Sequence, residues 1–217
     1  MSAVRVREAD GWRELSVDDG KVNALSQSLL DELNEQVQRA AQEGLALLIS
    51  GRAGCFSAGF DLRVMRVEGE AKTRLRAAGG LLTRQLLSHP APLVMACNGH
   101  AMAKGAFLLL CADWRVGSLG EFRICLNETA IGMPMPEPAL TLARERLAPT
   151  WLSRAVLQAE AFDPRQALAA GFFDQLSAPE ALLDSARAAM SRLAALDRPA
   201  YAETRRRLNR DLLARLE

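Results

Sequence analysis

Short apolar runs alternate with segments of helical periodicity along the first two thirds of the chain. Nearly every position is apolar over residues 45–50 and 93–97, which predicts two fully buried strands. Over residues 29–40 the apolar side chains recur every three or four positions, which predicts an amphipathic helix capped by Ser26 or Ser28. Because strands and helices alternate, the pattern indicates a layered α/β protein rather than a helical bundle.

The remaining segments extend this pattern toward a helical C-terminal region. Residues 13–17 and 113–117 are predicted as further strands. The charged segment 68–88 is predicted as one or two helices, and we interpret its charges as a solvated helix face. After Pro136 the predicted helices cover residues 139–147, 150–158, 164–170, 179–196 and 199–216.

Length and charge narrow the classes of function. With 217 residues, of which 49% are hydrophobic, the chain can bury a full core, so we expect one large domain. Lysine and arginine number 27 against 26 acidic residues, which leaves a net charge of +1. Such a chain has no global field to attract nucleic acid or a membrane surface, so chemistry on a small molecule is the better expectation.

The cysteines and the N-terminus indicate the compartment. The four cysteines lie inside apolar runs without metal-ligand or redox spacing, so we expect buried thiols, no metal site and a reducing environment. The N-terminal stretch lacks the apolar core of a signal peptide, and no run is long enough to cross a bilayer. A cytoplasmic protein without a membrane partner is therefore predicted.

Two short stretches, residues 56–62 and 98–105, place small residues between an apolar strand and a helix. Small residues let a carbonyl group approach the main chain, and the first amides of a helix have no partner within it. Two such turns facing each other would hold an oxyanion. Each donor of this kind is worth roughly 3–4 kcal/mol in catalysis.

Motifs in and around these turns resemble the crotonase superfamily, in the order and spacing of the enoyl-CoA hydratase/isomerase family. They are Asn23-Ala24-Leu25, Ser57-Ala58-Gly59-Phe60-Asp61-Leu62, Asn98-Gly99-His100-Ala101, Cys111-Ala112-Asp113 and Asn127-Glu128 with Gly132 and Pro134. The resemblance covers about residues 13–180. It implies a spiral of repeated ββα units over residues 1–148, then a C-terminal helical region over 149–217 that assembles a homotrimer or a hexamer of two trimers.

The resemblance also assigns positions in the site. The first amide of an oxyanion hole would be that of Phe60. The second would be that of Lys104, in Ala103-Lys104-Gly105, where the family has three glycines. A backbone donor survives this change if the local dihedral angles suit an L-residue. The Lys104 side chain has two interpretations, a solvated residue or a cation near the thioester or the CoA phosphates.

The substrate implied by the resemblance is an acyl-CoA thioester, so coenzyme A enters as part of the substrate and no separate cofactor is expected. Its binding residues would lie along the first turn, the loop before it and the start of the helix after the second turn. They are Val22, Ala24, Ser57, Ala58, Asp61, Leu62, Gly105 and Phe107. Because the chain ends sooner than many members of the family, we expect a pocket that is open or completed by a neighbouring subunit.

Two carboxylate positions decide the chemistry in this family. Hydratases use two glutamates to hold and deprotonate a water; here the first position is Phe107 and the second is Glu128. A lone glutamate among apolar neighbours can act as a base, a pattern similar to that of Δ3,Δ2-enoyl-CoA isomerases. Glu128 is therefore the predicted catalytic residue; the alternative is a surface loop glutamate.

Other functions stay open at this point. A hydratase could use Glu128 alone, with a water held by backbone groups. The changes at Lys104 and Phe107 also allow a non-catalytic acyl-CoA binder, and another CoA-ester reaction, such as hydrolysis or decarboxylation, is a further option.

Overall fold

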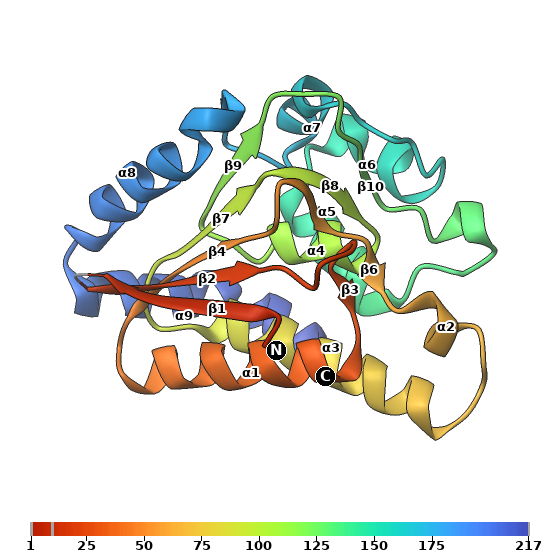
Figure 1. Ribbon diagram of the computed structural model, residues 1–217, viewed down its shortest axis with the longest axis horizontal. Coiled ribbons are helices and arrows are strands. Elements are labelled where there is room, and N and C mark those ends of the chain that lie inside the picture. Colours follow the sequence, from red (N-terminus) through yellow and green to blue (C-terminus); the bar gives the residue numbers. More distant parts are fainter. Residues whose placement is uncertain (1, 10, 217) are drawn as a thin grey trace.

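A six-stranded sheet runs through the middle of the computed structural model, which describes residues 2–9 and 11–216 (Figure 1). Its strand order is β1-β2-β4-β7-β9-β11. The strands are β1 (Val4–Ala9), β2 (Trp12–Val17), β4 (Ala46–Ser50), β7 (Leu93–Cys97), β9 (Trp114–Ser118) and β11 (Gln175–Ser177). β1 pairs antiparallel with β2, and all the other neighbours in this sheet pair parallel.

Two smaller sheets lie beside the large one. β5 (Gly54–Ser57), β8 (Gly99–Met102) and β10 (Ile124–Cys125) form one, and β3 (Ala24–Leu25) pairs with β6 (Gly59–Phe60) in the other. Successive segments of the chain thus add one strand to the large sheet, one or two to the smaller sheets, and then a helical segment. This arrangement is the predicted spiral of ββα units.

The helices agree closely with the predicted periodicity. They are α1 (Gln27–Gln42), α2 (Leu62–Met65), α3 (Glu70–Ser88), α4 (Lys104–Leu109), α5 (Glu137–Arg146), α6 (Pro149–Val156), α7 (Pro164–Ala170), α8 (Leu182–Ala194) and α9 (Arg198–Arg215), with short 3₁₀ turns at Thr129–Ile131 and Pro179–Ala181. Ser26 caps α1 as predicted, accepting a hydrogen bond from the amide of Leu29. The segment 68–88 is mostly one helix, which continues through its two glycines.

The structure corrects the expectations in two places. β1 was not predicted, because Val4 and Val6 alternate with arginines over only four residues; ion pairs across the strands, Arg7 with Glu14 (2.5 Å) and Glu8 with Arg13 (2.7 Å), help to hold this edge. The two small-residue stretches are also not simple turns. They contain the end of β5, all of β6 and all of β8, short strands that pair with segments distant in sequence.

Alternate residues of the central strands face two separate cores. In β4, Leu47 and Ile49 belong to the main core, in which α1 and α3 also pack, whereas Ala46 and Leu48 face a smaller core beneath α8. α9 returns to pack against α3. The helices after residue 149 therefore contact both the sheet and α3, and their role in assembly stays a prediction.

The chain as described, apart from residues 1, 10 and 217, contains no helix both long enough and apolar enough to pass through a membrane.

Candidate active site

Three parallel strands bring the predicted site residues to one edge of the small sheet. β8 pairs parallel with both β5 and β10, so the chain leaves all three strands at the same end. Phe60 follows β5, Lys104 follows β8 and Glu128 follows β10. Pairing between distant strands thus gathers the three residues.

The first turn is braced from beneath by Asn23. The Asn23 side-chain amide donates to the carbonyls of Val17 (2.9 Å) and Phe56 (3.1 Å), although the residue is fully buried and has a φ of 50°. Its own carbonyl accepts a hydrogen bond from the Ser57 hydroxyl (2.8 Å), which in turn accepts one from the amide of Gly59 (3.2 Å). These bonds set the path of the backbone into β6.

The second turn begins at a strained residue. Ala103 has φ 47° and ψ −126°, a conformation that favours glycine. The amide of Ala103 donates to the carbonyl of Cys125 (2.8 Å), and its carbonyl accepts from the amide of Phe107 (3.1 Å). These two main-chain hydrogen bonds hold Ala103 in a backbone conformation that usually requires glycine.

The amides of Phe60 and Lys104 lie on adjoining segments. The Asp61 amide donates to the Leu25 carbonyl (3.2 Å), so the Phe60 amide, one residue earlier in the strand, points away from β3. A Cβ added to Gly59 would lie 3.2 Å from the Lys104 amide nitrogen. As the first residue of α4, Lys104 has no partner for this amide within the helix.

Glu128 lies at the start of the 3₁₀ turn after β10 and is 9% exposed. Its Oε2 atom is buried and has no hydrogen-bond partner in the part of the chain described. Burial raises the pKa of this carboxyl group, against the opposing effects of its own backbone amide and of the Lys104 charge. The interpretation of Glu128 as a surface loop residue is therefore wrong.

The Lys104 side chain does not extend freely into solvent either. Its Nζ atom donates to the Thr83 hydroxyl on α3 and lies 6.0 Å from the centre of the Phe60 ring. Burial lowers the pKa of Lys104, while Cys111 and Glu128 act in the opposite direction. Sequence analysis missed Thr83, because the contact joins residues from different elements and leaves no local signal.

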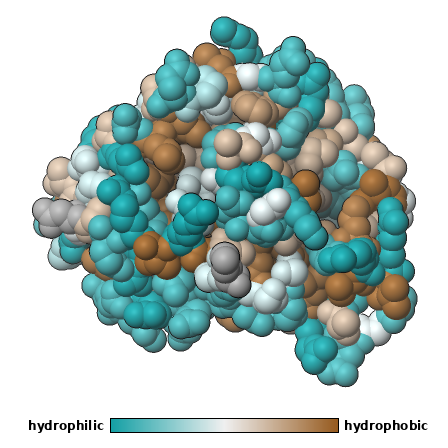
Figure 2. Space-filling view, in the orientation of Figure 1, coloured by the Kyte–Doolittle hydropathy of each residue, from teal (hydrophilic) through white to brown (hydrophobic). Residues whose placement is uncertain are grey.

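The predicted substrate-binding residues divide into buried and accessible groups. Ser57, Gly105 and Phe107 are buried; a Cβ on Gly105 would lie 2.5 Å from the Ser57 carbonyl oxygen, so this glycine permits close packing. Val22 (51%) and Leu62 (45%) are exposed. Figure 2 shows apolar residues among the polar surface at the edge where Figure 1 places α2. The contacts of these residues to CoA stay a prediction.

The remaining predicted binding residues lie on the loop and turn that face each other here. Ala24 is in β3, and the amide of Ala58 donates to the carbonyl of Val22 (3.0 Å). The Asp61 carboxylate caps α2 by accepting a hydrogen bond from the backbone amide of Arg63 (3.0 Å). It also forms an ion pair with the Arg63 guanidinium group. The Asp61 carboxylate thus has a structural role in the free protein.

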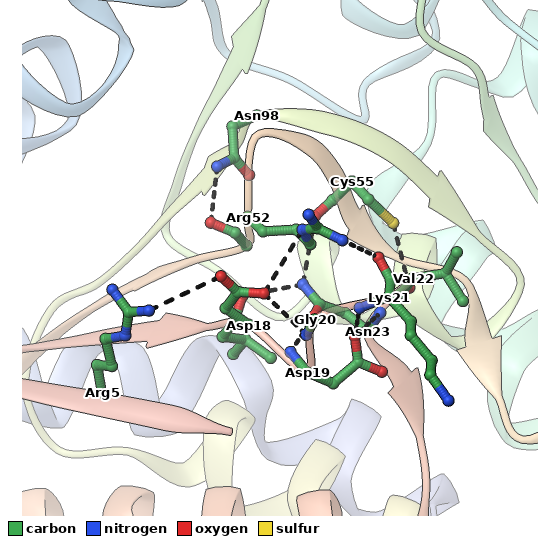
Figure 3. A network of polar contacts seen from close by, with 12 residues as sticks. Arg5, Asp18, Asp19, Gly20, Lys21, Val22, Asn23, Arg52, Cys55 and Asn98 are labelled. Carbon is green, nitrogen blue, oxygen red and sulfur yellow. Dashed lines mark hydrogen bonds and ion pairs between the residues drawn. The ribbon is translucent and has the colours of Figure 1, made fainter. Parts of the chain in front are cut away.

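The loop between β2 and β3 is held by a polar network (Figure 3). Arg52 donates to the Lys21 carbonyl (2.5 Å) and pairs with Asp18 (3.5 Å). The Cys55 thiol donates to the Val22 carbonyl (3.1 Å). The Lys21 side chain extends away from these contacts, so the network orders the backbone and leaves this ammonium group accessible (Figure 3).

Among residues 2–9 and 11–216, no cluster of three or more His, Cys, Asp or Glu side chains is arranged to hold a metal ion. A surface pocket of about 290 Å³ lies between the α3–β7 loop and the segment joining α8 to α9, and none of the predicted site residues lines it.

Comparison with known proteins identifies the relatives of this chain. A family model described as enoyl-CoA hydratase/isomerase matches residues 13–217. A solved structure of a family protein from Pseudomonas syringae is 41% identical with a TM-score of 0.95, covering 99% of this chain and 93% of that one. An enoyl-CoA isomerase from Mycobacterium tuberculosis is 38% identical with a TM-score of 0.94, covering 99% and 94% respectively.

The descriptions differ on the reaction even for one protein. Another structure of the same M. tuberculosis protein, also 38% identical with a TM-score of 0.94, covering 99% of this chain and 91% of that one, is described as a probable enoyl-CoA hydratase. A probable enoyl-CoA hydratase from Mycobacterium avium is 28% identical over 208 residues, covering 92% of this chain and 79% of the relative.

The layered sheets and these matches define a crotonase-fold protein. The chain belongs to the enoyl-CoA hydratase/isomerase family, whose enzymes act on acyl-CoA thioesters. The predicted family and fold are thereby confirmed. The descriptions of the relatives do not favour isomerisation over hydration.

Proposed function

We propose that this protein is a Δ3,Δ2-enoyl-CoA isomerase that uses Glu128 as its single acid–base group. The proposal is carried by two observations: the Glu128 carboxylate is buried with its Oε2 atom unpartnered, and position 107 holds a buried phenylalanine. By family resemblance, Phe107 stands where hydratases have their other glutamate. A phenyl ring cannot orient or deprotonate water, whereas one carboxylate is sufficient to move a proton between two carbons.

The mechanism begins with the thioester carbonyl oxygen between the amides of Phe60 and Lys104. Glu128 removes a proton from C2 of a 3-enoyl-CoA, and the electron pair moves onto the thioester oxygen as an enolate. The two amides stabilise that oxygen more strongly as an anion than as a carbonyl. The protonated Glu128 then returns the proton at C4, which leaves a conjugated 2-enoyl-CoA and regenerates the carboxylate.

The environment of Glu128 supports this role. Burial raises the pKa of its carboxyl group toward the working pH, where a group can both accept and return a proton. The proposed reaction needs no metal or redox cofactor. Val22, Ala24, Ala58 and Leu62 would contact the CoA part of the substrate, and Phe107 would help to exclude water from the enolate.

Hydration is the second candidate, because the M. avium relative is described as a probable hydratase. In that reaction Glu128 alone would deprotonate a water held by backbone groups. The two reactions change the same absorbance in opposite directions. Isomerisation creates a conjugated thioester, and hydration destroys one.

The test is to incubate the protein separately with 3-enoyl-CoA and 2-enoyl-CoA while recording the absorbance of the conjugated thioester. We expect a gain with the 3-enoyl substrate, and a fall of about 10²–10⁴-fold in its rate for Glu128→Gln. Glu35→Gln, on the exposed side of α1, is the matched control and should keep full activity. A loss of absorbance with 2-enoyl-CoA would identify a hydratase, and binding without turnover would identify an acyl-CoA binder.

We also propose a homotrimer, or a hexamer of two trimers, in the cytoplasm. The exposed Ile131 (45%) and Leu157 (69%) offer apolar surface for such an assembly. Light scattering after size exclusion measures the mass directly. A monomer at micromolar concentration would contradict the proposed assembly.

A further inference from the structure

The two residues whose amides form the proposed oxyanion hole, Phe60 and Lys104, send their side chains to the same glycine of α3. A Cβ added to Gly79 would overlap the Phe60 ring and lie 3.5 Å from Lys104 Cε. Lys104 Nζ lies 6.0 Å from the centre of the Phe60 ring. The two side chains therefore lie together against α3 and form one wall beside their own amides.

Thr83, one turn further along α3, fixes the end of this wall. Its hydroxyl accepts a hydrogen bond from Lys104 Nζ and donates one to the Gly79 carbonyl (3.1 Å). Thr83 is only 7% exposed, so little water reaches these bonds. An apolar chain that pushed the ammonium group away from Thr83 would leave buried polar atoms unpaired, which is costly. The wall therefore resists displacement.

The interior next to this wall is apolar and contains unfilled space. Leu86 follows Gly79 by seven positions and continues its face of α3, with Thr83 between them. Leu86 lines a void of about 20 Å³ together with Leu82 and with Leu108 of α4. Along α3, the contact between Lys104 and Thr83 thus separates the glycine at the proposed site from this apolar region.

We propose that the Lys104 side chain limits the length of the acyl group, by closing the acyl pocket a short distance beyond the reacting carbons. The inference rests on the proposed function, which places the thioester oxygen at the Lys104 amide and the proton transfer at C2 and C4. A short acyl group ends before the lysine side chain. A longer one meets the Lys104 methylene groups and must bend toward solvent. The substrate class is therefore short-chain enoyl-CoA.

The length of the lysine side chain sets the size of the expected effect. Lys104→Ala keeps the backbone amide and removes the side chain beyond Cβ, which opens room for about four methylene groups of a straight chain. Each methylene group that becomes buried strengthens binding about fourfold. Because the opened space will be filled only in part, we expect a total gain of about 10–10²-fold for a long acyl group.

The direct test measures the binding of hexanoyl-CoA and decanoyl-CoA by calorimetry. Both acyl chains are saturated, so they are neither isomerised nor hydrated during the measurement. The parent protein should bind the two esters with similar affinity, whereas Lys104→Ala should bind decanoyl-CoA about 10–10²-fold more tightly than hexanoyl-CoA. Arg74→Ala, which truncates an exposed side chain of α3 paired with Glu70 (3.6 Å), is the control and should keep the parent ratio.

A second variant tests the anchor and keeps the proposal falsifiable if Lys104→Ala does not fold. Thr83→Val leaves Lys104 in place but removes its hydrogen-bond partner, so decanoyl-CoA should gain by a smaller factor, about threefold to tenfold. An unchanged ratio of the two affinities in the folded variants would overturn the inference. A parent protein that already binds decanoyl-CoA more than about tenfold more tightly than hexanoyl-CoA would overturn it as well.

Turnover separates this inference from the proposed function. With 3-hexenoyl-CoA and 3-decenoyl-CoA, the relative gain of the longer substrate in Lys104→Ala should appear in KM rather than in kcat. If the affinities change as expected but neither substrate is isomerised, the limit on chain length stands and the isomerase proposal fails. If the parent protein binds neither saturated ester, both proposals fail.

Discussion

The turns that carry the amides of Phe60 and Lys104 reach similar backbone arrangements by different routes. The first turn has Gly59 at a φ of +81°, a conformation that glycine adopts without strain because it has no Cβ. The second has Ala103 at a φ of 47°, where an L-residue is strained by about 1–3 kcal/mol. The comparison teaches that a glycine motif can be replaced when surrounding contacts hold the backbone in place.

Those contacts differ in kind. Asn23 braces the first turn with side-chain hydrogen bonds, whereas the second is held by main-chain bonds to Cys125 and Phe107 and by close packing of Gly105 on Ser57. The first turn therefore depends on one side chain. The second depends on the assembled sheet.

The largest expected effect is on activity, from Gly59→Ala. The new Cβ would lie 2.9 Å from the Met102 carbonyl oxygen and 3.2 Å from the Lys104 amide, so it should disturb the spacing of the two turns. We expect kcat/KM to fall about 10²–10³-fold, as when one oxyanion donor is lost. Gly44→Ala is the control, with a φ of +66° but open space around it. An equal loss of activity in both variants would remove the link between the turns.

Asn23→Ala should give the largest loss of stability. It leaves the buried carbonyls of Val17 and Phe56 without this donor, which we expect to lower the free energy of unfolding by about 3 kcal/mol. The counterpart Asn98→Ala removes one hydrogen bond, to Gly51 (2.7 Å), and should lower it by about 1 kcal/mol. Denaturant unfolding of both variants measures the difference; equal losses would mean that the first turn has no special brace.

Gly105→Ala tests the packing beneath the second turn. Its Cβ would lie 2.5 Å from the Ser57 carbonyl oxygen, so we expect a loss of about 1–3 kcal/mol on unfolding. Gly80→Ala is the matched control, since a Cβ there meets nothing within 4 Å and alanine favours a helix. The two substitutions should therefore change the melting temperature in opposite directions.

Ala103→Gly should have the smallest effect, and its sign is decisive. Relief of the strained φ should outweigh the greater freedom of glycine in the unfolded chain, for a net gain of about 1 kcal/mol. Thermal unfolding provides the measurement. A loss of stability instead would mean that Ala103 is not strained and that the two turns do not differ in the way described.

The sequence predicts individual helices and strands better than it predicts which of them lie next to one another in the fold. The amphipathic helix after Ser26 and the apolar strands before Gly51 and Asn98 have strong local patterns, and the structure confirms them. β1 has only a short alternation of Val and Arg, and the strands of the smaller sheets are two to four residues long. They form because partners distant in the chain supply their hydrogen bonds and ion pairs.

The sequence by itself determined the family and the candidate chemistry, because residue types such as Glu128 and Phe107 limit which protons can move. Tertiary structure decided how those residues meet. Parallel pairing of β5, β8 and β10 brings three distant segments to one edge, and burial there decides the charge environment of Glu128. Thr83 on α3 contacts Lys104 at the start of α4 across 21 positions of the sequence, and local spacing does not encode this contact.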